Sequence, residues 1–289
     1  MLIKRLNQIQ IRGGFVNNVG SDGNEKDIKV HFYDRNVLEQ KLSGFFYILG
    51  RFLFHYIFML LFGFRIHNTK YVPKSAGYIL IGNHQSHFDP MSFPVASVHN
   101  FTFAARHTLF KNALFGKLIS FFGAFPIRRG IRDNFAFKQM KVELDRGNAL
   151  IVFPEGTRSF DEKILGFKSG VEIILKMTKA PILPAVIQGN SKNFPKSKKI
   201  FQLSARGTMN VIFGKIISAE EYLAYPRRKF MKALEAEIRR LDAELKNKPY
   251  YKCRGITTIS DIIMHVINFN TTCLFYCVKA INFVARLFK

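Results

Sequence analysis

Six short apolar runs alternate with helical patterns between residues 77 and 216, and this alternation restricts the possible fold more than any other feature. The runs have the length and character of buried strands; they are Tyr78–Ile81, Phe101–Ala105, Ala124–Ile127, Ala149–Phe153, Ile182–Ile187 and Met209–Phe213. Helical patterns lie at Leu109–Phe122, Asp133–Arg146, Ser169–Thr178 and Pro226–Lys246. Alternating strands and helices predict an α/β domain with a mixed, mostly parallel central sheet flanked by helices.

Two apolar segments flank the α/β region. Phe45–Phe64 holds 13 Phe, Leu and Ile residues, interrupted by Arg51 and His55. These two polar residues are four apart, so they share a helix face and could snorkel together from an embedded helix. The flanking charges show no asymmetry that would orient a span, which favours a helix lying in one leaflet. The tail from Ile256 fits an amphipathic helix on a membrane, with a helix packed on the domain itself as the alternative.

These patterns predict four parts of the chain. Residues 1–43 form a polar extension, and residues 44–66 form an N-terminal membrane-embedded helical segment. The α/β domain follows over residues 67–250, and residues 251–289 form the C-terminal apolar and amphipathic helical segment.

The charge of the chain indicates an acidic partner. Lys and Arg number 44 against 20 Asp and Glu, a formal net charge of +24, which suits nucleic acid or an anionic lipid surface. The 31 Phe, concentrated in apolar stretches, favour the membrane and argue against nucleic acid. The three Cys have no metal-ligand spacing, and Cys273 and Cys277 are best explained as small apolar residues.

A polar loop with two histidines follows the first predicted strand. Asp89-Pro90 resembles a helix start, with Asp89 as N-cap. His84 and Asp89 are about 140° apart on an ideal helix, so only a turn can bring them together. An imidazole held by a carboxylate can take a proton from a hydroxyl. The alternatives are a solvated polar loop and an iron site using His87, Asp89 and His107, which fits a β-barrel better than this chain.

Cationic and hydroxyl side chains follow two further strands. Glu155, Gly156, Thr157 and Arg158 come after Ala149–Phe153, with Lys168 a little beyond. Arg128 and Arg129 come directly after Ala124–Ile127. Residues at strand ends of an open α/β sheet converge on one crevice, and guanidinium groups there suit phosphate. The pattern predicts a phosphate-bearing substrate held beside a general base.

Four ordered motifs resemble the blocks of the 1-acyl-glycerol-3-phosphate acyltransferase family of glycerolipid acyltransferases. Asn83-His84 through Asp89 matches Asn-His-x4-Asp, and residues 123–129, 152–159 and 181–184 match the second, third and fourth blocks. The resemblance covers about residues 70 to 220. Arg128 stands where relatives often have an acidic or neutral residue, which leaves open which of the two arginines contacts phosphate.

The resemblance implies a glycerol-3-phosphate acyltransferase-like fold and a chemistry without metal or cofactor. His84 would be the general base, and Asp89 would fix its tautomer. Phosphate would bind to Arg129 and to the third block, that is Glu155, Gly156, Thr157 and Arg158. The implied partners are lysophosphatidic acid, an acyl-CoA or acyl-carrier protein and an anionic membrane surface, with no nucleic acid. The enzyme would be membrane-associated with its active site on the cytoplasmic face. Other acceptors (another lysolipid or glycerol-3-phosphate) and a non-catalytic membrane-binding protein stay as alternatives.

Overall fold

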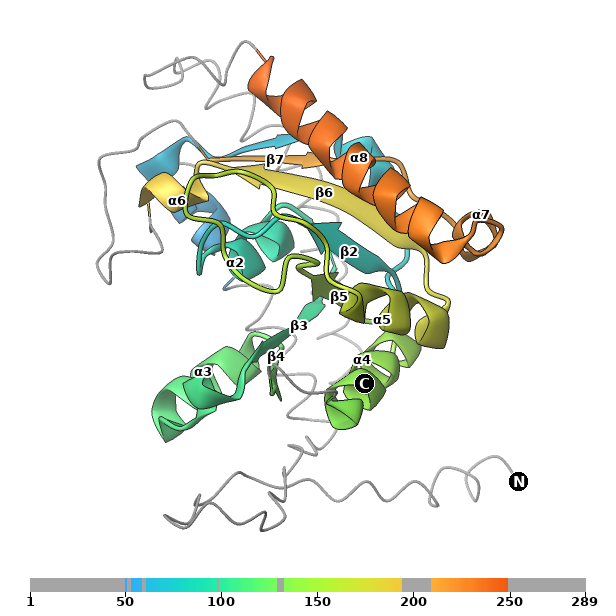
Figure 1. Cartoon of the computed structure of the whole chain (residues 1–289). Helices are drawn as coiled ribbons and strands as arrows, with labels where there is room; N and C mark the ends of the chain where they lie inside the picture. The colour runs from blue at the N-terminus through green and yellow to red at the C-terminus, as the bar shows by residue number, and fades with distance from the viewer. Residues whose placement is uncertain are drawn as a thin grey trace, which may run out of the picture.

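The computed structural model describes residues 50, 53–58, 61–97, 99–128, 133–193 and 209–248, and a seven-stranded sheet lies at their centre (Figure 1). The strand order is β1-β7-β6-β2-β5-β3-β4, and only the β6–β7 pair is antiparallel. The strands are β1 (Arg65–His67), β2 (Ile79–Gly82), β3 (Phe101–Arg106), β4 (Ala124–Ile127), β5 (Ala149–Val152), β6 (Ile182–Gln188) and β7 (Asn210–Phe213). The expected mixed, mostly parallel sheet flanked by helices is confirmed.

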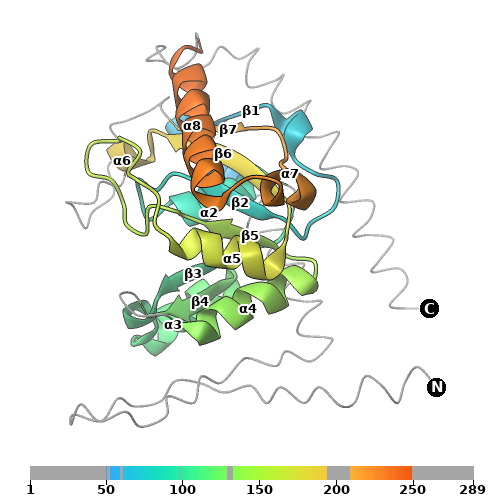
Figure 2. The same ribbon diagram turned by 45° about the vertical axis from the view of Figure 1, so that its right-hand side comes forward.

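Helices cover both faces of the sheet. They are α2 (Asp89–Val95), α3 (Ala113–Phe121), α4 (Asn134–Asp145), α5 (Gly170–Thr178), α6 (Asn190–Asn193), α7 (Ala219–Leu223) and α8 (Arg227–Lys246). The 3-10 turn η2 (Thr69–Tyr71) lies between β1 and β2, and η3 (His107–Phe110) lies between β3 and α3. Figure 2 shows α8, α5 and α4 one below another over one face, while α2 packs on the other.

Continuous apolar runs in β2, β5 and β6 explain why helices are needed on both faces. Side chains of a strand alternate between faces. Ile79 and Ile81 therefore pack with α4 and α5, whereas Leu80 between them packs with α2. All three are fully buried. Parallel strands of this kind are stable only when helices shield both sides.

The part of the first apolar segment that the structure describes is helical at residues 53–58 and 61–62 and packs against the domain. Phe58, Phe62 and Phe64 are buried in the same cluster as Phe93 of α2. His55 is 2% exposed, its ring beside that of Phe64, so the expectation that it snorkels outward is wrong. This face of the helix is core, because the aromatic side chains around it find partners in the protein.

The membrane segments themselves stay predictions. Arg51, residues 1–43 and the expected amphipathic segment 251–289 lie outside the described residues. Within the described ranges, no helix combines the length and the apolarity needed to cross a bilayer.

The ends of α3 differ from the expected Leu109–Phe122 at the N-terminal side. Residues 107–110 form η3 instead, and the Asn112 side chain then caps α3 by accepting from the Phe115 amide at 3.0 Å. Gly123 ends the helix as expected, with φ of +88°. A Cβ at this position would lie 2.2 Å from the Phe101 carbonyl oxygen, so only glycine lets β4 return beside β3.

Candidate active site

The loop after β2 brings His84 and Asp89 into direct contact. The His84 Nδ1 lies 2.8 Å from Asp89 Oδ2, and Asp89 is fully buried while His84 is 8% exposed. A carboxylate only accepts hydrogen bonds, so Nδ1 carries the proton and Nε2 keeps its lone pair. This is the arrangement of a histidine prepared to act as a base, because the tautomer is fixed by its partner.

Asp89 is held by four donors. Besides His84, the backbone amides of Gln85 and Ser86 donate to Oδ2 at 2.6 and 2.7 Å. Asn190 of α6 donates to Oδ1 at 2.8 Å. The sequence indicated Asp89 as the N-cap of the helix, and this prediction is wrong. Phe88 is the N-cap, and Asp89 is the first residue of α2. Its side chain turns back over the preceding loop because donors are available there.

Asparagines that the sequence reasoning left out of the candidate site fix the loop to the sheet. Asn83 donates to the Ile187 carbonyl at 2.9 Å and accepts from the Ile187 amide at 2.8 Å, so it binds β6 as a strand neighbour would. Asn190 donates to Asp89 and to Ser92 Oγ at 3.0 Å. Asn83 stands in the first motif block, but nothing near Asn190 in the sequence indicates its partner 101 residues away.

The third motif block clamps the histidine loop from the neighbouring strand. The Glu155 Oε1 accepts from the His84 amide at 3.0 Å, and the Ser159 amide donates to the His84 carbonyl at 2.8 Å. Phe153 at the end of β5 stacks on the His84 ring with centroids 4.1 Å apart. The backbone and the ring of His84 are therefore both positioned by the loop after β5.

Glu155 is 1% exposed, which is unusual for a glutamate predicted to bind substrate. Burial raises the pKa of its carboxyl from the ordinary 4.5 to about 7, although hydrogen bonds from the His84 and Leu165 backbone oppose the shift. It accepts a hydrogen bond from the His84 backbone, which makes it a positioning residue in this geometry. A contact with substrate stays a prediction.

The remaining predicted phosphate-binding residues lie at the same edge of the sheet. Gly156 has φ of +65°, and a Cβ there would come 3.0 Å from the Lys168 side chain, so glycine lets Lys168 cross the loop. Thr157 and Arg158 follow directly and are half-buried. Arg128 follows β4, where its amide donates to Asp133 at 2.8 Å. Arg129 lies outside the described residues.

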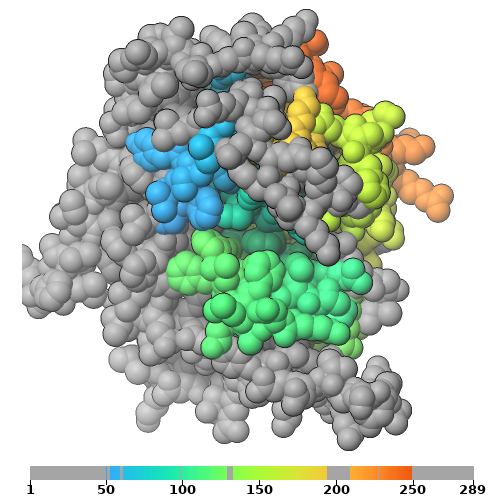
Figure 3. Space-filling model, turned by 90° about the vertical axis from the view of Figure 1, so that its left-hand side faces the viewer, coloured from blue at the N-terminus to red at the C-terminus, as the bar shows by residue number. Residues whose placement is uncertain are grey.

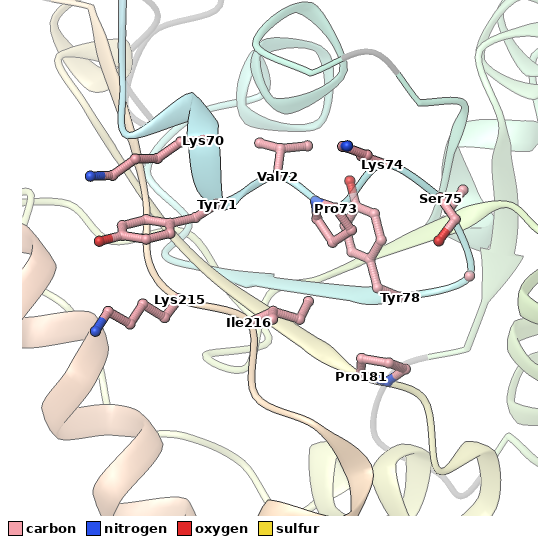
Figure 4. A pocket seen from close by; sticks show the side chains of 12 residues that line it. Lys70, Tyr71, Val72, Pro73, Lys74, Ser75, Tyr78, Pro181, Lys215 and Ile216 are labelled. Carbon is pink, nitrogen blue, oxygen red and sulfur yellow. The ribbon is translucent and has the colours of Figure 1, made fainter.

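Two further features, possible metal ligation and a surface groove, bear on the site. Among the described residues, no group of three His, Cys, Asp or Glu side chains could hold a metal ion. An open groove of about 570 Å³ lies where Tyr78 precedes β2, Pro181 precedes β6 and Ile216 follows β7 (Figure 4). Lys70, Lys74 and Lys215 also line it. These segments lie at the amino ends of β2 and β6, opposite the His84 loop, so the groove is separate from the site.

Comparison with known proteins agrees with this geometry. The pattern of the Acyltransferase family matches residues 63–188, which include both clamped loops. A 1-acyl-sn-glycerol-3-phosphate acyltransferase of Bacillus subtilis is 26% identical over 187 residues, covering 64% of this chain and 89% of the relative. One of Streptococcus pneumoniae is 35% identical over 126 residues, 43% of this chain and 46% of the relative.

A solved structure shows the same architecture. The crystal structure of the 1-acyl-sn-glycerophosphate acyltransferase from Thermotoga maritima superposes with a TM-score of 0.55 and 27% sequence identity, covering 64% of this chain and 73% of that one. Residues 63–188, which carry the His84–Asp89 pair, thus match the Acyltransferase family. Over about two thirds of its length, the chain is similar in sequence and fold to 1-acyl-sn-glycerol-3-phosphate acyltransferases.

Proposed function

We propose that this chain transfers a fatty acyl group from acyl-CoA or acyl-carrier protein to the sn-2 hydroxyl of 1-acyl-glycerol-3-phosphate, giving phosphatidic acid for phospholipid synthesis. The observation that carries the proposal is the 2.8 Å contact between His84 Nδ1 and a buried Asp89, inside a loop fixed from two neighbouring strands. The similarity to relatives named as 1-acyl-sn-glycerol-3-phosphate acyltransferases supports the choice of acceptor.

In the proposed reaction, the acyl group moves directly from the thioester sulfur to the sn-2 oxygen of the acceptor. His84 Nε2 takes the proton of the sn-2 hydroxyl, and the oxygen attacks the thioester carbonyl carbon. The new C–O bond replaces the C–S bond, and the proton held on His84 passes to the departing thiolate. Asp89 stabilises the imidazolium formed in between, since it faces Nδ1 with a fixed negative charge.

Arg158, Lys168, Arg128 and Arg129 are proposed to bind the acceptor phosphate, with Thr157 and the Gly156 backbone beside them. Guanidinium and ammonium groups together suit a phosphate monoester better than a zwitterionic headgroup. That charge match favours lysophosphatidate over lysophosphatidylcholine, while glycerol-3-phosphate carries the same phosphate and stays as the second candidate. We also propose that the protein works on the cytoplasmic face of a membrane, where anionic lipids attract a chain of net charge +24.

An acyl-transfer assay with purified full-length protein in mixed micelles tests the function. Labelled oleoyl-CoA is offered with lysophosphatidate, glycerol-3-phosphate or lysophosphatidylcholine, and acyl-carrier protein thioester serves as the second donor. We expect phosphatidate from lysophosphatidate, and a loss of roughly 10²- to 10⁴-fold in His84→Ala. His67→Ala is the matched control, because the His67 side chain hydrogen-bonds Asn210 of β7 at 3.4 Å, far from the loop.

Each outcome decides a different part of the proposal. Product from another acceptor keeps the mechanism and changes the substrate. Full turnover by folded His84→Ala refutes the general base. For the phosphate residues, Arg158→Ala should raise KM with little change in kcat, and an unchanged KM removes Arg158 from phosphate binding. If no acylated product forms with any acceptor and either donor, the enzymatic function is refuted and a non-catalytic membrane protein is favoured.

A further inference from the structure

Helix α3 places apolar side chains in solvent. Its sequence is Ala-Leu-Phe-Gly-Lys-Leu-Ile-Ser-Phe, yet Gly116 is the one residue of the nine that is buried. Leu114 is 81% exposed, Leu118 52% and Phe115 44%. These three side chains lie within about 100° of each other around the helix, so they form one apolar face.

A clustered face of this kind needs a partner, whereas scattered exposed leucines do not. The helix is also strictly bounded: the Asn112 side chain caps its start and Gly123 ends it, so its exposed face is not the result of fraying. The two ends of α3 are thus defined, and its apolar face is exposed along an intact helix.

The apolar face continues onto the first apolar segment. The Phe122 ring, at the C-cap of α3, contacts the Phe54 ring edge-on at 6.1 Å, and Leu53 next to it is 57% exposed. Figure 3 shows blue atoms, the colour of residues 53–58 and 61–62, beside the green atoms of α3 on one side of the molecule. That side carries the carboxyl ends of β2, β3 and β5, where the His84 loop lies.

The charge on this part of the chain is one-sided. Between residues 40 and 132 there are eleven Lys and Arg and a single acidic residue, the buried Asp89. Lys117 lies on α3 and Lys111 lies just before its N-cap Asn112, and both lysines are exposed. Helix α8, in contrast, carries charges of both signs, as its ion pairs show. An apolar face with exposed lysines on and next to its helix is complementary to an anionic lipid surface.

We propose that the apolar face of α3, formed by Leu114, Phe115 and Leu118, docks on an anionic bilayer beside the first apolar segment. The inference rests on the proposed membrane-associated function and adds the surface that contacts lipid. Docking there brings the edge of the sheet that carries His84 against the leaflet. A lysolipid then reaches the site with its acyl chain still in the membrane.

The absence of tryptophan from the chain makes a direct test possible. The full-length Leu114→Trp variant carries a single indole on α3, and full-length Leu223→Trp is the matched control. Leu223 is 49% exposed on α7, beside Glu220 and Glu221. Each variant is mixed with vesicles of equal parts phosphatidylglycerol and phosphatidylcholine, with and without brominated acyl chains. We expect a blue-shifted, bromine-quenched emission for Leu114→Trp and no change for Leu223→Trp.

A second pair of variants measures binding strength. Leu114→Glu/Leu118→Glu should lower the vesicle partition coefficient at least about tenfold, since two leucines leave the apolar contact. Leu223→Glu should leave it unchanged. Circular dichroism confirms that each variant is folded, and Leu114→Ala/Leu118→Ala gives the same test at lower cost to solubility.

Three results overturn the docking surface. The first is sedimentation with vesicles while the Leu114→Trp indole stays in water. The second is an indole already shielded without lipid, which would mean that a second copy or another segment of the chain covers α3. The third is equal partitioning of wild type and Leu114→Glu/Leu118→Glu. The proposed function fails separately from the docking surface. If the protein shows no acyl transfer in micelles but the Leu114→Trp indole inserts into vesicles, the enzymatic function is refuted and the docking surface stands.

Discussion

The loop between β2 and α2 and the helix α3 depart from the usual distribution of side chains in opposite directions. Residues 83–86 and Asp89 are polar and buried, and each is held by hydrogen bonds. Leu114, Phe115 and Leu118 of α3 are apolar and exposed. Buried polar groups and exposed apolar clusters are the informative exceptions, since each costs free energy unless something else stabilises it.

Helix α8 shows what the ordinary case looks like in the same molecule. Its stripe of Phe230, Leu234, Ile238, Leu241 and Leu245 is buried as the sequence predicted, and its outer side carries ion pairs such as Arg239–Glu235. The comparison teaches where to look for function. The loop concentrates polar chemistry at a protected point, and α3 keeps an apolar surface available for a partner.

The largest expected effect comes from a substitution in the buried polar loop between β2 and α2. Asp89→Asn should lower kcat/KM by about 10³- to 10⁴-fold, because the amide can donate to Nδ1 and leave the proton on Nε2. Steady-state kinetics with lysophosphatidate measures it. Asp145→Asn, which removes an exposed pair with Lys141, is the control and should stay near wild type. A loss smaller than about tenfold would show that the tautomer is not set by Asp89.

A matched pair of leucines tests the apolar side. Leu241→Ala on α8 should lower the free energy of unfolding by about 2–5 kcal/mol, because a fully buried side chain is replaced by a cavity. Leu118→Ala makes the same change in α3 and should cost less than about 1 kcal/mol. Urea unfolding gives both values. Equal losses would mean that α3 is packed rather than exposed.

Titration of Glu155 should make stability depend on pH. The pKa is about 7 in the folded protein against an ordinary 4.5, so the folded state holds a proton that the unfolded state has lost in this window. The free energy of unfolding therefore falls as pH rises from about 4.5 to 7, by up to about 3 kcal/mol. Above pH 7 this loss is complete.

Glu155→Gln removes that titration and keeps an oxygen that can accept from the His84 amide. Urea unfolding at pH 5 and pH 8 should then show a smaller fall for the variant than for wild type. Glu143→Gln, a buried glutamate on α4 away from the loop, should keep the wild-type difference. If the free energy of unfolding depends on pH identically in wild type, Glu155→Gln and Glu143→Gln, titration of Glu155 is not the cause.

The smallest effect on turnover is expected at the asparagine that supports Asp89. Asn190→Ala leaves Asp89 Oδ1 without its donor, which should cost about 1–3 kcal/mol of stability and lower kcat several-fold. Asn193→Ala is matched in type, helix and burial, but its side chain donates to the Gly189 carbonyl. It should lose stability only. Equal effects on kcat would show that Asn190 is merely structural.

Much of the fold could be predicted because local patterns carry it. Strands β2 to β7 lie within one residue of the expected runs at either end, since buried strands need continuous apolar sequence. The three-residue β1 gave no such signal and forms by pairing with β7. His55 was misplaced for the same reason: the sequence shows an apolar helix but not which side the protein covers.

The sequence by itself determined the α/β class, the inward stripe of α8 and the residue types of the site, because periodicity and motif spacing are properties of neighbouring residues. Only the tertiary structure decided that Asp89 turns back to His84, that Asn190 supports it from α6 and that Glu155 lies under the loop. It also decided that α3 faces outward. Those outcomes depend on which donors and surfaces meet in space, and contacts between residues 71 or 101 positions apart leave no local pattern.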